Sequence, residues 1–176
     1  MGAGMDITLK KYSEEYERET IVRIAKFFGF HRELLNSDVA EEETGWDTAE
    51  NDLQCWLTEE DSELYLIFDR DRCVGFLRVG YRGPQVAWIE DIFVDEEYCG
   101  RGIASESIRR AEEIIAKNPQ YTAVCFDVVP RNRSALNLYY KLRYDRLSIL
   151  TVRKDLRSEK EDGFLHESFL GYDFKL

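Results

Sequence analysis

The sequence has few of the residues that build metal sites and disulfide frameworks. It contains two histidines, His31 and His166, which lie far apart along the chain. Its four cysteines, Cys55, Cys73, Cys99 and Cys125, show no C-x-x-C spacing. This pattern predicts no zinc site and no disulfide scaffold. Free thiols are typical of a protein in a reducing environment, so we expect a cytoplasmic location.

The chain also lacks a long apolar run and an excess of positive charge. No stretch approaches the roughly eighteen apolar residues that span a bilayer, and no N-terminal signal peptide is visible. Lys and Arg total 24 against 35 Asp and Glu, which gives a net charge of −11. Nucleic-acid binders need surplus cations, so we expect neither a nucleic acid nor a membrane as partner. An acidic surface suits a small cationic molecule, although it also serves solubility.

The length of 176 residues fits one domain with its own core. We predict a single domain over 1–176, in which residues 1–4 are a candidate cloning remnant before the true start at Met5. Residues 155–176 read as a C-terminal extension. The pattern at 164–176 suggests a last strand, a candidate for pairing or exchange with a second subunit in a homodimer.

The first half of the chain predicts one helix and four strands. A short strand around Ile7 and Leu9 precedes a helix that Ser13 caps and that runs through about Phe28. The following stretch, 30–61, is acidic and irregular. Three β-rich runs then follow, separated by short turns, so we expect an antiparallel meander. They lie at 63–69, 73–80 and 86–94.

The second half predicts a crossover connection. A helix at 102–117 separates strand 86–94 from a strand at 121–129, and this order makes the two strands parallel. A helix at 132–142, capped by Asn132, leads to a strand at about 146–154. The predicted fold is therefore mixed α/β, with a mostly antiparallel sheet, one parallel pair and flanking helices.

Two glycines flank an arginine in the stretch "CGRGIA" before the helix at 102–117. A plain tight connection is one explanation. A dinucleotide-binding turn is not, because five residues separate the strand end from Gly100 and because Ser105 replaces the third glycine. A P-loop lacks its Gly-Lys-Ser/Thr. The remaining explanation is that the amides of residues 100–104, at the positive end of the helix, bind a pyrophosphate with help from Arg101.

These motifs resemble the GNAT superfamily of acetyl-CoA-dependent N-acetyltransferases over about residues 63–152. The family's pyrophosphate signature, Q/R-x-x-G-x-G/A, is similar to the stretch from Cys99 to Ala104. A second signature, N-x-x-A-x-x-x-Y-x-x-x-G-F, is matched by Asn132, Ala135, Tyr139 and Tyr144. Cys99 stands where Gln or Arg is usual. Arg143 replaces the usual glycine, so that turn must be built without a residue that adopts positive φ easily.

The resemblance implies acetyl-CoA as co-substrate and a splayed parallel strand pair. The pantetheine arm would pair with backbone groups that the splay leaves open on strand 86–94. The pyrophosphate would lie at the start of the helix at 102–117. The second signature adds Asn132 and Ala135 to the residues that would hold the coenzyme. The implied cofactor-binding residues are Ile92, Phe93, Val94, Gly100, Arg101, Gly102, Ile103, Ala104, Ser105, Asn132 and Ala135.

The resemblance also implies two catalytic residues. Tyr139 corresponds to the general acid that protonates the departing thiolate, although its position also suits an ordinary core tyrosine. The strand "WIEDIFV" resembles that of spermidine/spermine and streptothricin acetyltransferases, where a glutamate at the Glu90 position deprotonates or orients the amine. A structural or electrostatic part is the alternative. Because Glu90 and Asp91 are adjacent, we predict that they point to opposite faces and that only one faces the acceptor.

The predicted function is transfer of an acetyl group to a primary amine by direct attack in a ternary complex. The charge and the "WIEDIFV" resemblance favour a small cation such as a polyamine or an aminoglycoside. The acidic stretch 41–52, with Trp46 and Trp56, is a candidate acceptor wall, or else a solvated helix with core tryptophans. The alternatives are a protein or peptide amino-group acetyltransferase and a non-catalytic CoA-binding regulatory domain. A covalent cysteine route ranks lower, because no histidine is placed beside Cys99 or Cys125.

Overall fold

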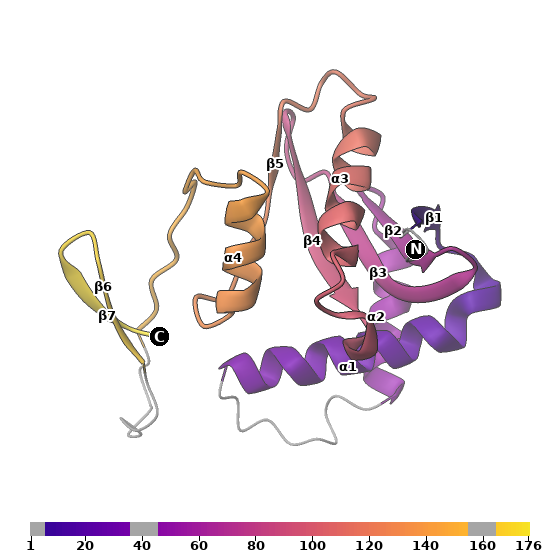
Figure 1. The fold of residues 1–176 in the computed structure, drawn as a ribbon, viewed down its shortest axis with the longest axis horizontal. Coiled ribbons are helices and arrows are strands. Elements are labelled where there is room, and N and C mark those ends of the chain that lie inside the picture. The colour runs from indigo at the N-terminus through magenta and orange to yellow at the C-terminus, as the bar shows by residue number, and fades with distance from the viewer. Residues whose placement is uncertain (1–5, 36–45, 155–164) are drawn as a thin grey trace, which may run out of the picture.

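A five-stranded sheet forms the centre of the molecule in the computed structural model, which describes residues 6–35, 46–154 and 165–176 (Figure 1). Its strand order is β1-β2-β3-β4-β5. The first four strands are antiparallel, and β5 runs parallel to β4. The predicted mixed fold with one parallel pair is confirmed. The strand bounds are β1 Ile7–Lys11, β2 Ser62–Asp69, β3 Arg72–Gly80, β4 Val86–Val94 and β5 Ala123–Cys125.

Helices cover both faces of the sheet. On one face, α1 (Glu17–Leu35) and α2 (Trp46–Thr58) share an apolar cluster with alternate residues of β2 and β3, including Phe76. On the other face, α3 (Ile103–Ile115) packs its buried isoleucines against Leu77 and its neighbours. This division follows from the two-residue period of a strand, which sends Phe76 and Leu77 to opposite sides.

Local sequence signals account for some helix ends and fail at others. The Asn132 side chain accepts a hydrogen bond of 3.0 Å from the Ala135 amide at the start of α4 (Arg133–Lys141), so the predicted cap is confirmed. The prediction for Ser13 is wrong. Its hydroxyl donates to the Glu15 carboxylate, and a short 3-10 turn, Glu14–Tyr16, precedes α1 instead. The helix α1 also continues to Leu35, well past Phe28.

The parallel pair is short. Only three residues of β4, Val86 to Trp88, pair with β5, at Ala123 to Cys125. The predicted strand 121–129 therefore pairs over a third of its length, and the chain leaves the sheet after Cys125 to reach α4 (Figure 1). The second half of β4 has β3 as its neighbour on one side and, within the described ranges, no strand on the other.

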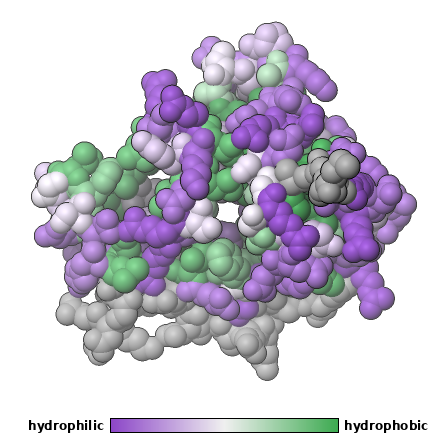
Figure 2. Space-filling model, viewed as in Figure 1, coloured by the Kyte–Doolittle hydropathy of each residue, from purple (hydrophilic) through white to green (hydrophobic). Residues whose placement is uncertain are grey.

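The predicted strand at 146–154 is not formed. This segment has no strand partner among the described residues, and Leu147, Ile149 and Val152 are 79, 76 and 68 % exposed. Alternating apolar residues favour β structure, but a strand needs a neighbour for its backbone groups, which a sequence pattern cannot supply. Figure 2 shows apolar surface gathered on the left of this face, where Figure 1 places the C-terminal part of the chain.

The C-terminal end forms a separate hairpin rather than one last strand. Strands β6 (His166–Phe169) and β7 (Tyr172–Lys175) pair in a two-stranded sheet. The two residues between them, Leu170 and Gly171, both have positive φ, as a tight hairpin turn requires. No helix in the described part of the chain has the length and apolar character needed to span a membrane.

Arg143 adopts the conformation that the family signature gives to glycine. Its φ is 74°, its amide donates to the Tyr140 carbonyl, and the Tyr144 amide donates to the Tyr139 carbonyl. These two bonds close α4 as a Schellman motif. The turn is therefore built at positive φ without a glycine, because the motif enforces that φ on whichever residue stands there.

Replacing Arg143 by glycine is expected to stabilise the protein. Relief of the left-handed strain outweighs the added chain entropy of glycine, by about 0.5–1 kcal/mol. Urea unfolding followed by circular dichroism measures this difference. Lys141→Gly, inside α4, is the matched control and should destabilise by a similar amount. Equal destabilisation by both variants would contradict the assignment of strain to Arg143.

Candidate active site

The start of α3 offers unpaired backbone amides. Gly102 caps the helix at φ 85°, and Gly100 lies at φ 74° with open space around its α-carbon. The first amide that the helix itself satisfies is that of Glu106, which donates to the Gly102 carbonyl at 3.0 Å. The amides of residues 103–105 therefore point out of the helix end, where the helix dipole favours an anion. This cradle fits a pyrophosphate.

The side chains beside this cradle have other partners in the structure. The Arg101 guanidinium donates to the Glu97 carbonyl at 2.7 Å and lies over the Tyr98 ring. Burial and the charges of Glu96 and Asp95 raise the pKa of the Cys99 thiol. A raised pKa disfavours the nucleophilic thiolate, which agrees with the low rank of a covalent cysteine route.

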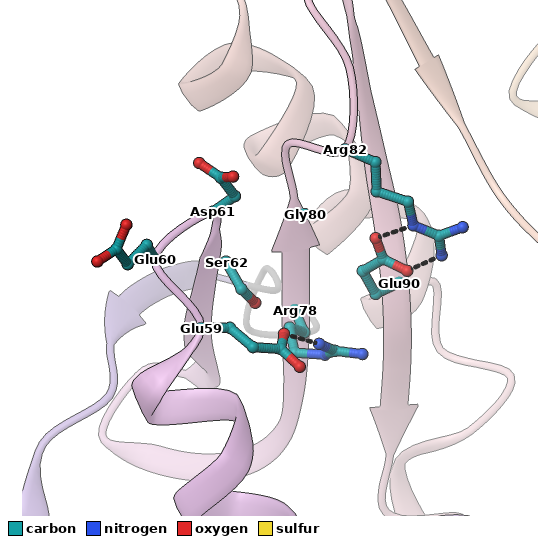
Figure 3. Close-up of a pocket in the computed structure, with 8 residues that line it drawn as sticks. All are labelled: Glu59, Glu60, Asp61, Ser62, Arg78, Gly80, Arg82 and Glu90. Carbon is teal, nitrogen blue, oxygen red and sulfur yellow. Dashed lines mark hydrogen bonds and ion pairs between the residues drawn. The ribbon is translucent and has the colours of Figure 1, made fainter.

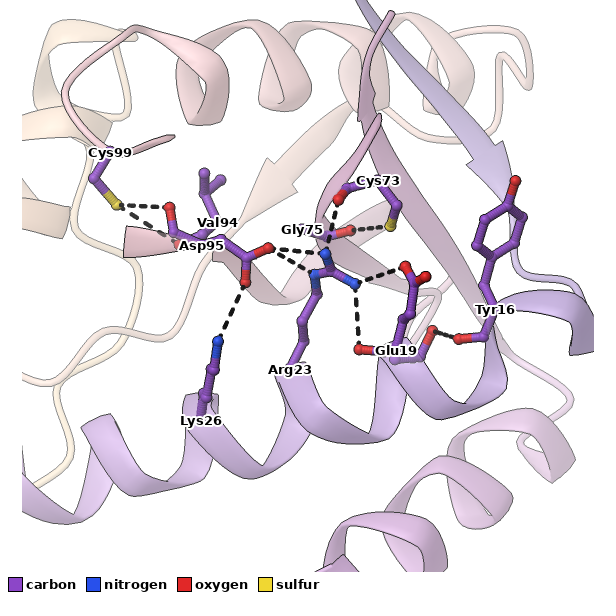
Figure 4. A network of polar contacts seen from close by, with 10 residues as sticks. Tyr16, Glu19, Arg23, Lys26, Cys73, Gly75, Val94, Asp95 and Cys99 are labelled. Atoms are coloured by element: carbon purple, nitrogen blue, oxygen red, sulfur yellow. Dashed lines mark hydrogen bonds and ion pairs between the residues drawn. The ribbon is translucent and has the colours of Figure 1, made fainter. Parts of the chain in front are cut away.

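A network around Arg23 fixes the segment that leads into the cradle. Arg23 of α1 donates to Asp95 at 2.8 and 3.0 Å and to the Cys73 carbonyl at 2.7 Å. Asp95 is the residue directly after β4, and its carbonyl accepts the Tyr98 amide in the following 3-10 turn, Glu96–Tyr98. Figure 4 shows Arg23 reaching from α1 to both strand ends.

The open edge of β4 lies between the cradle and α4. Ile92, Phe93 and Val94 pair with β3, while the splay leaves their other side without a strand among the described residues. The Cys99 thiol contacts the Val94 carbonyl at 3.6 Å. The predicted splay at these residues is confirmed, and it provides backbone groups to which an amide-bearing chain can bind.

A β-bulge places Glu90 and Asp91 on the same face of the sheet. Arg78 pairs with Asp91 and Val79 pairs with Ile89, so Glu90 is the extra residue in β4. Ile89 and Ile92 both join the cluster under α3, which turns the two carboxylates between them toward the other face. The prediction that Glu90 and Asp91 point to opposite faces is therefore wrong, because strict alternation fails at a bulge.

A pocket of about 480 Å³ lies on this carboxylate-bearing face (Figure 3). One wall comes from β3, β4 and the turn between them, with Arg78, Gly80, Arg82 and Glu90. The other wall is the segment 59–62, which joins α2 to β2 and brings three acidic side chains. The sequence prediction did not include this segment in the site, although the acidic run "EED" directly before β2 is a signal that could have indicated it.

Glu90 is held between Gly80 and Arg82. A β-carbon on Gly80 would lie 2.2 Å from Glu90 Oε1, so only glycine lets the carboxylate lie there. Arg82 Nε donates to Glu90 Oε1 at 2.6 Å, and Arg82 Nη2 pairs with Glu90 Oε2. The Glu90 side chain is 9 % exposed, whereas that of Arg82 is 50 % exposed. The carboxylate is thus buried and neutralised from the solvent side.

Asp91 is buried as well, at 14 % exposed, and has a different arginine. Arg78 Nε donates to Asp91 Oδ2 at 2.7 Å, and Arg78 Nη1 donates to Glu59 Oε2 at 2.7 Å. The Arg78 guanidinium also lies 4.7 Å from the centre of the Trp56 ring. Burial raises the pKa of Asp91, and the charge of Glu90 adds to this, while Arg78 opposes it. Asp91 therefore serves as an anchor for Arg78.

Tyr139 of α4 lies close enough to Asp91 for the charge of that carboxylate to act on it. Its ring stacks on Phe126 at 4.0 Å and packs beside the α3-side cluster, so it is partly a core residue, as the alternative interpretation held. Burial first, and then the charge of Asp91, raise the pKa of Tyr139 to about 12. The phenol is consequently protonated at neutral pH. The neighbouring Tyr140 is 69 % exposed and points away from this cluster.

The predicted acceptor wall includes two tryptophans, Trp46 and Trp56. Trp56 is buried in the cluster under α1 and α2, so the core interpretation holds for it. Residues 36–45 and the side chain of Trp46 lie outside the described residues. The acidic wall that the structure describes comes from residues 59–61.

Comparisons with known proteins identify the family. The model of the Acetyltransferase (GNAT) family matches residues 31–144, which is more than half of the chain. The protein therefore belongs to the GNAT family of acetyltransferases. The resemblance seen in the sequence is confirmed, and so is the GNAT fold. No curated protein sequence matches the chain.

Solved structures show the same fold at low identity. The Bacillus subtilis protein YycN has a TM-score of 0.66 and 19 % identity, covering 86 % of this chain and all of its own. The N-acetyltransferase PaiA of Thermoplasma acidophilum, in complex with coenzyme A, has a TM-score of 0.60 and 18 % identity, covering 97 % of both chains. Aminoglycoside N-acetyltransferase AAC(6')-Iy, in complex with CoA, has a TM-score of 0.61 and 15 % identity, covering 89 % of this chain and 99 % of its own.

Proposed function

We propose that this acetyltransferase transfers the acetyl group of acetyl-CoA to a primary amine of a small polycation, such as a polyamine or an aminoglycoside. The observation that carries the proposal is the acidic pocket, which presents Glu90 from the bulge of β4 beside the open strand edge. The aminoglycoside acetyltransferases among the structures of similar fold support the same substrate class.

The coenzyme would be held by this chain's backbone. The amides of Gly102, Ile103, Ala104 and Ser105 would donate to the pyrophosphate, and Arg101 would turn from the Glu97 carbonyl to join them. Gly100 would keep its approach free of a side chain. The edge at Ile92, Phe93 and Val94 would bind the pantetheine amides, and the α4 start with Asn132 and Ala135 would close the far side. The bound coenzyme would supply an activated acetyl thioester.

Two side chains would move the protons. Glu90, directly or through water, would accept a proton from the substrate ammonium, because only the neutral amine attacks a carbonyl. A C–N bond then forms while the C–S bond breaks, and Tyr139 would donate its phenolic proton to the departing thiolate. The second proton of the attacking nitrogen would pass to water as the amide forms, and Tyr139 would regain a proton from water. Burial raises the pKa of a thiol as it does that of a phenol, so a pKa of about 12 for Tyr139 remains compatible with this donation.

A thiol-release assay with acetyl-CoA tests the proposal. The amine panel contains spermidine, kanamycin, n-butylamine and a peptide with a free N-terminus. We expect the polycations to give the highest kcat/KM, because each adds contacts to the carboxylates at residues 59–61. Preference for the peptide would support the protein-acetylating alternative instead. Coenzyme binding without thiol release from any amine would support a regulatory domain.

We also propose that the C-terminal part mediates a homodimer. The exposed apolar residues of the segment 146–152 and the separate hairpin β6–β7 form the kind of surface that usually contacts a partner. Light scattering after gel filtration should give the mass of two chains. A monomer mass at all concentrations would contradict this.

A further inference from the structure

Arg82 occupies the position in which the acceptor pocket would receive a cation. It lies in the turn between β3 and β4, and its guanidinium pairs with both oxygens of Glu90. The carbon at its centre is 4.5 Å from the centre of the Trp88 ring. A carboxylate and an aromatic face together form a typical receptor for alkylammonium and guanidinium groups. The chain therefore fills this receptor with its own cation.

The contacts of Arg82 also provide a place to which it can move. Its Nη1 atom donates to Asp127 Oδ2 at 3.2 Å, just beyond β5. The Asp127 side chain is 72 % exposed, so this second carboxylate lies toward solvent, away from the buried Glu90. Gly83, next in the turn, has open space around it. The half-exposed Arg82 side chain can rotate toward Asp127, and its guanidinium then remains paired with the Asp127 carboxylate.

Arg78, the other arginine of the pocket, lacks this freedom. Its side chain is 15 % exposed and it joins Asp91, Glu59 and the Trp56 ring. Loss of Arg78 would leave the buried Asp91 without its arginine, whereas departure of Arg82 exposes Glu90 to the pocket. The two arginines therefore differ in role: Arg78 anchors the wall, and Arg82 covers the carboxylate nearest to the acceptor.

We infer that Arg82 competes with the cationic acceptor for Glu90, covering that carboxylate in the free enzyme and moving toward Asp127 when an ammonium group binds. This inference rests on the proposed function, because it places the acceptor amine at Glu90. It makes Arg82 a residue that limits acceptor affinity. A small monoamine must displace Arg82 with one charge, whereas a polycation gains further contacts with the acidic wall at residues 59–61.

The competition has a measurable consequence for binding. A site that is open only part of the time shows an apparent Kd raised by the reciprocal of the open fraction. Removing the competitor therefore tightens amine binding. With an open fraction of about one tenth, the Arg82→Gln variant binds spermidine and n-butylamine about 10-fold more tightly than the wild type.

Isothermal titration of the CoA-loaded protein with each amine tests this, and Arg110→Gln is the matched control. Arg110 is 46 % exposed and pairs with Glu106 and Glu113 on α3, so its loss changes the net charge equally. We expect a lower Kd only for Arg82→Gln and Arg82→Ala. KM for spermidine should fall in parallel, with kcat maintained. A merely structural Arg82 would instead give a higher KM and a lower kcat.

Two outcomes overturn the inference. One is amine binding to Arg82→Gln that is unchanged or weaker, or no tighter than to Arg110→Gln. The other needs no variant: in the wild-type protein, the Nε–H resonance of Arg82 should shift when spermidine is added, and an unchanged resonance at saturating amine would show that Arg82 stays on Glu90. Absence of thiol release from every amine would refute the proposed function, whereas these binding measurements would still report on Arg82.

Discussion

Replacement of Tyr139 by phenylalanine is expected to lower kcat by about 10²–10⁴-fold, the usual contribution of a general acid. The substitution removes one oxygen and retains the ring that stacks on Phe126, so packing of α4 should survive. Steady-state thiol release gives kcat, and titration with CoA gives the cofactor affinity, which should stay within about twofold because the phenol is assigned no contact with the pyrophosphate.

The control for this substitution is Tyr140→Phe. Tyr140 loses the same hydroxyl from the next position of α4, but its side chain is exposed. Its kcat should match that of the wild type. Because burial and the charge of Asp91 raise the pKa of Tyr139 to about 12, wild-type kcat should show no decline from this phenol below about pH 11. Full turnover by Tyr139→Phe would refute the acid role.

Replacement of Arg23 by alanine is expected to destabilise the fold by about 3–5 kcal/mol, the cost of breaking a buried ion pair. The Arg23 and Asp95 side chains are 11 and 13 % exposed. Lys26 keeps an ion pair of 4.0 Å with Asp95 Oδ1, but its side chain is 61 % exposed, so it offsets only a small part of the loss. The Cys73 carbonyl loses its donor as well. Denaturant unfolding measures the difference.

The same substitution should also weaken coenzyme binding, because Asp95 begins the segment that leads to Gly100 and Gly102. Arg110→Ala is the control, since that arginine pairs only with exposed or half-buried partners of its own helix and should cost less than about 1 kcal/mol. An Arg23→Ala protein as stable as Arg110→Ala would mean that the network in Figure 4 contributes little.

Local patterns predicted the elements on which the proposed coenzyme site depends. The bounds 86–94 for β4 are those of the structure, because a β-rich run between a Gly-Pro turn and an acidic loop is limited on both sides. The isoleucine and alanine spacing of α3 predicted its buried face, and Asn132 predicted the start of α4. The splay beside Ile92 to Val94 follows from a crossover that ends in a short strand.

The proposed acceptor pocket was less predictable, because it depends on contacts between distant segments. The bulge at Glu90 arises from pairing with β3, and nothing in "WIEDIFV" marks it. Glu90 pairs with Arg82, which lies in the turn between β3 and β4. The sequence predicted this turn but not the contact of its arginine with Glu90. The acidic wall at 59–61 faces the pocket because α2 ends there, and α2 itself lay in a stretch without a clear period. The prediction of a strand at 146–154 was wrong for the same reason, because strand pairing depends on residues that are distant in the sequence.

The account depends on the claim that free amides at the start of α3 bind the pyrophosphate of coenzyme A. Amide chemical shifts of the ¹⁵N-labelled protein, recorded during titration with CoA, test this most directly. We predict the largest changes at residues 100–105, with smaller ones at 92–94. Changes confined to other parts of the chain, or none at saturating CoA, would contradict the assignment of the coenzyme site.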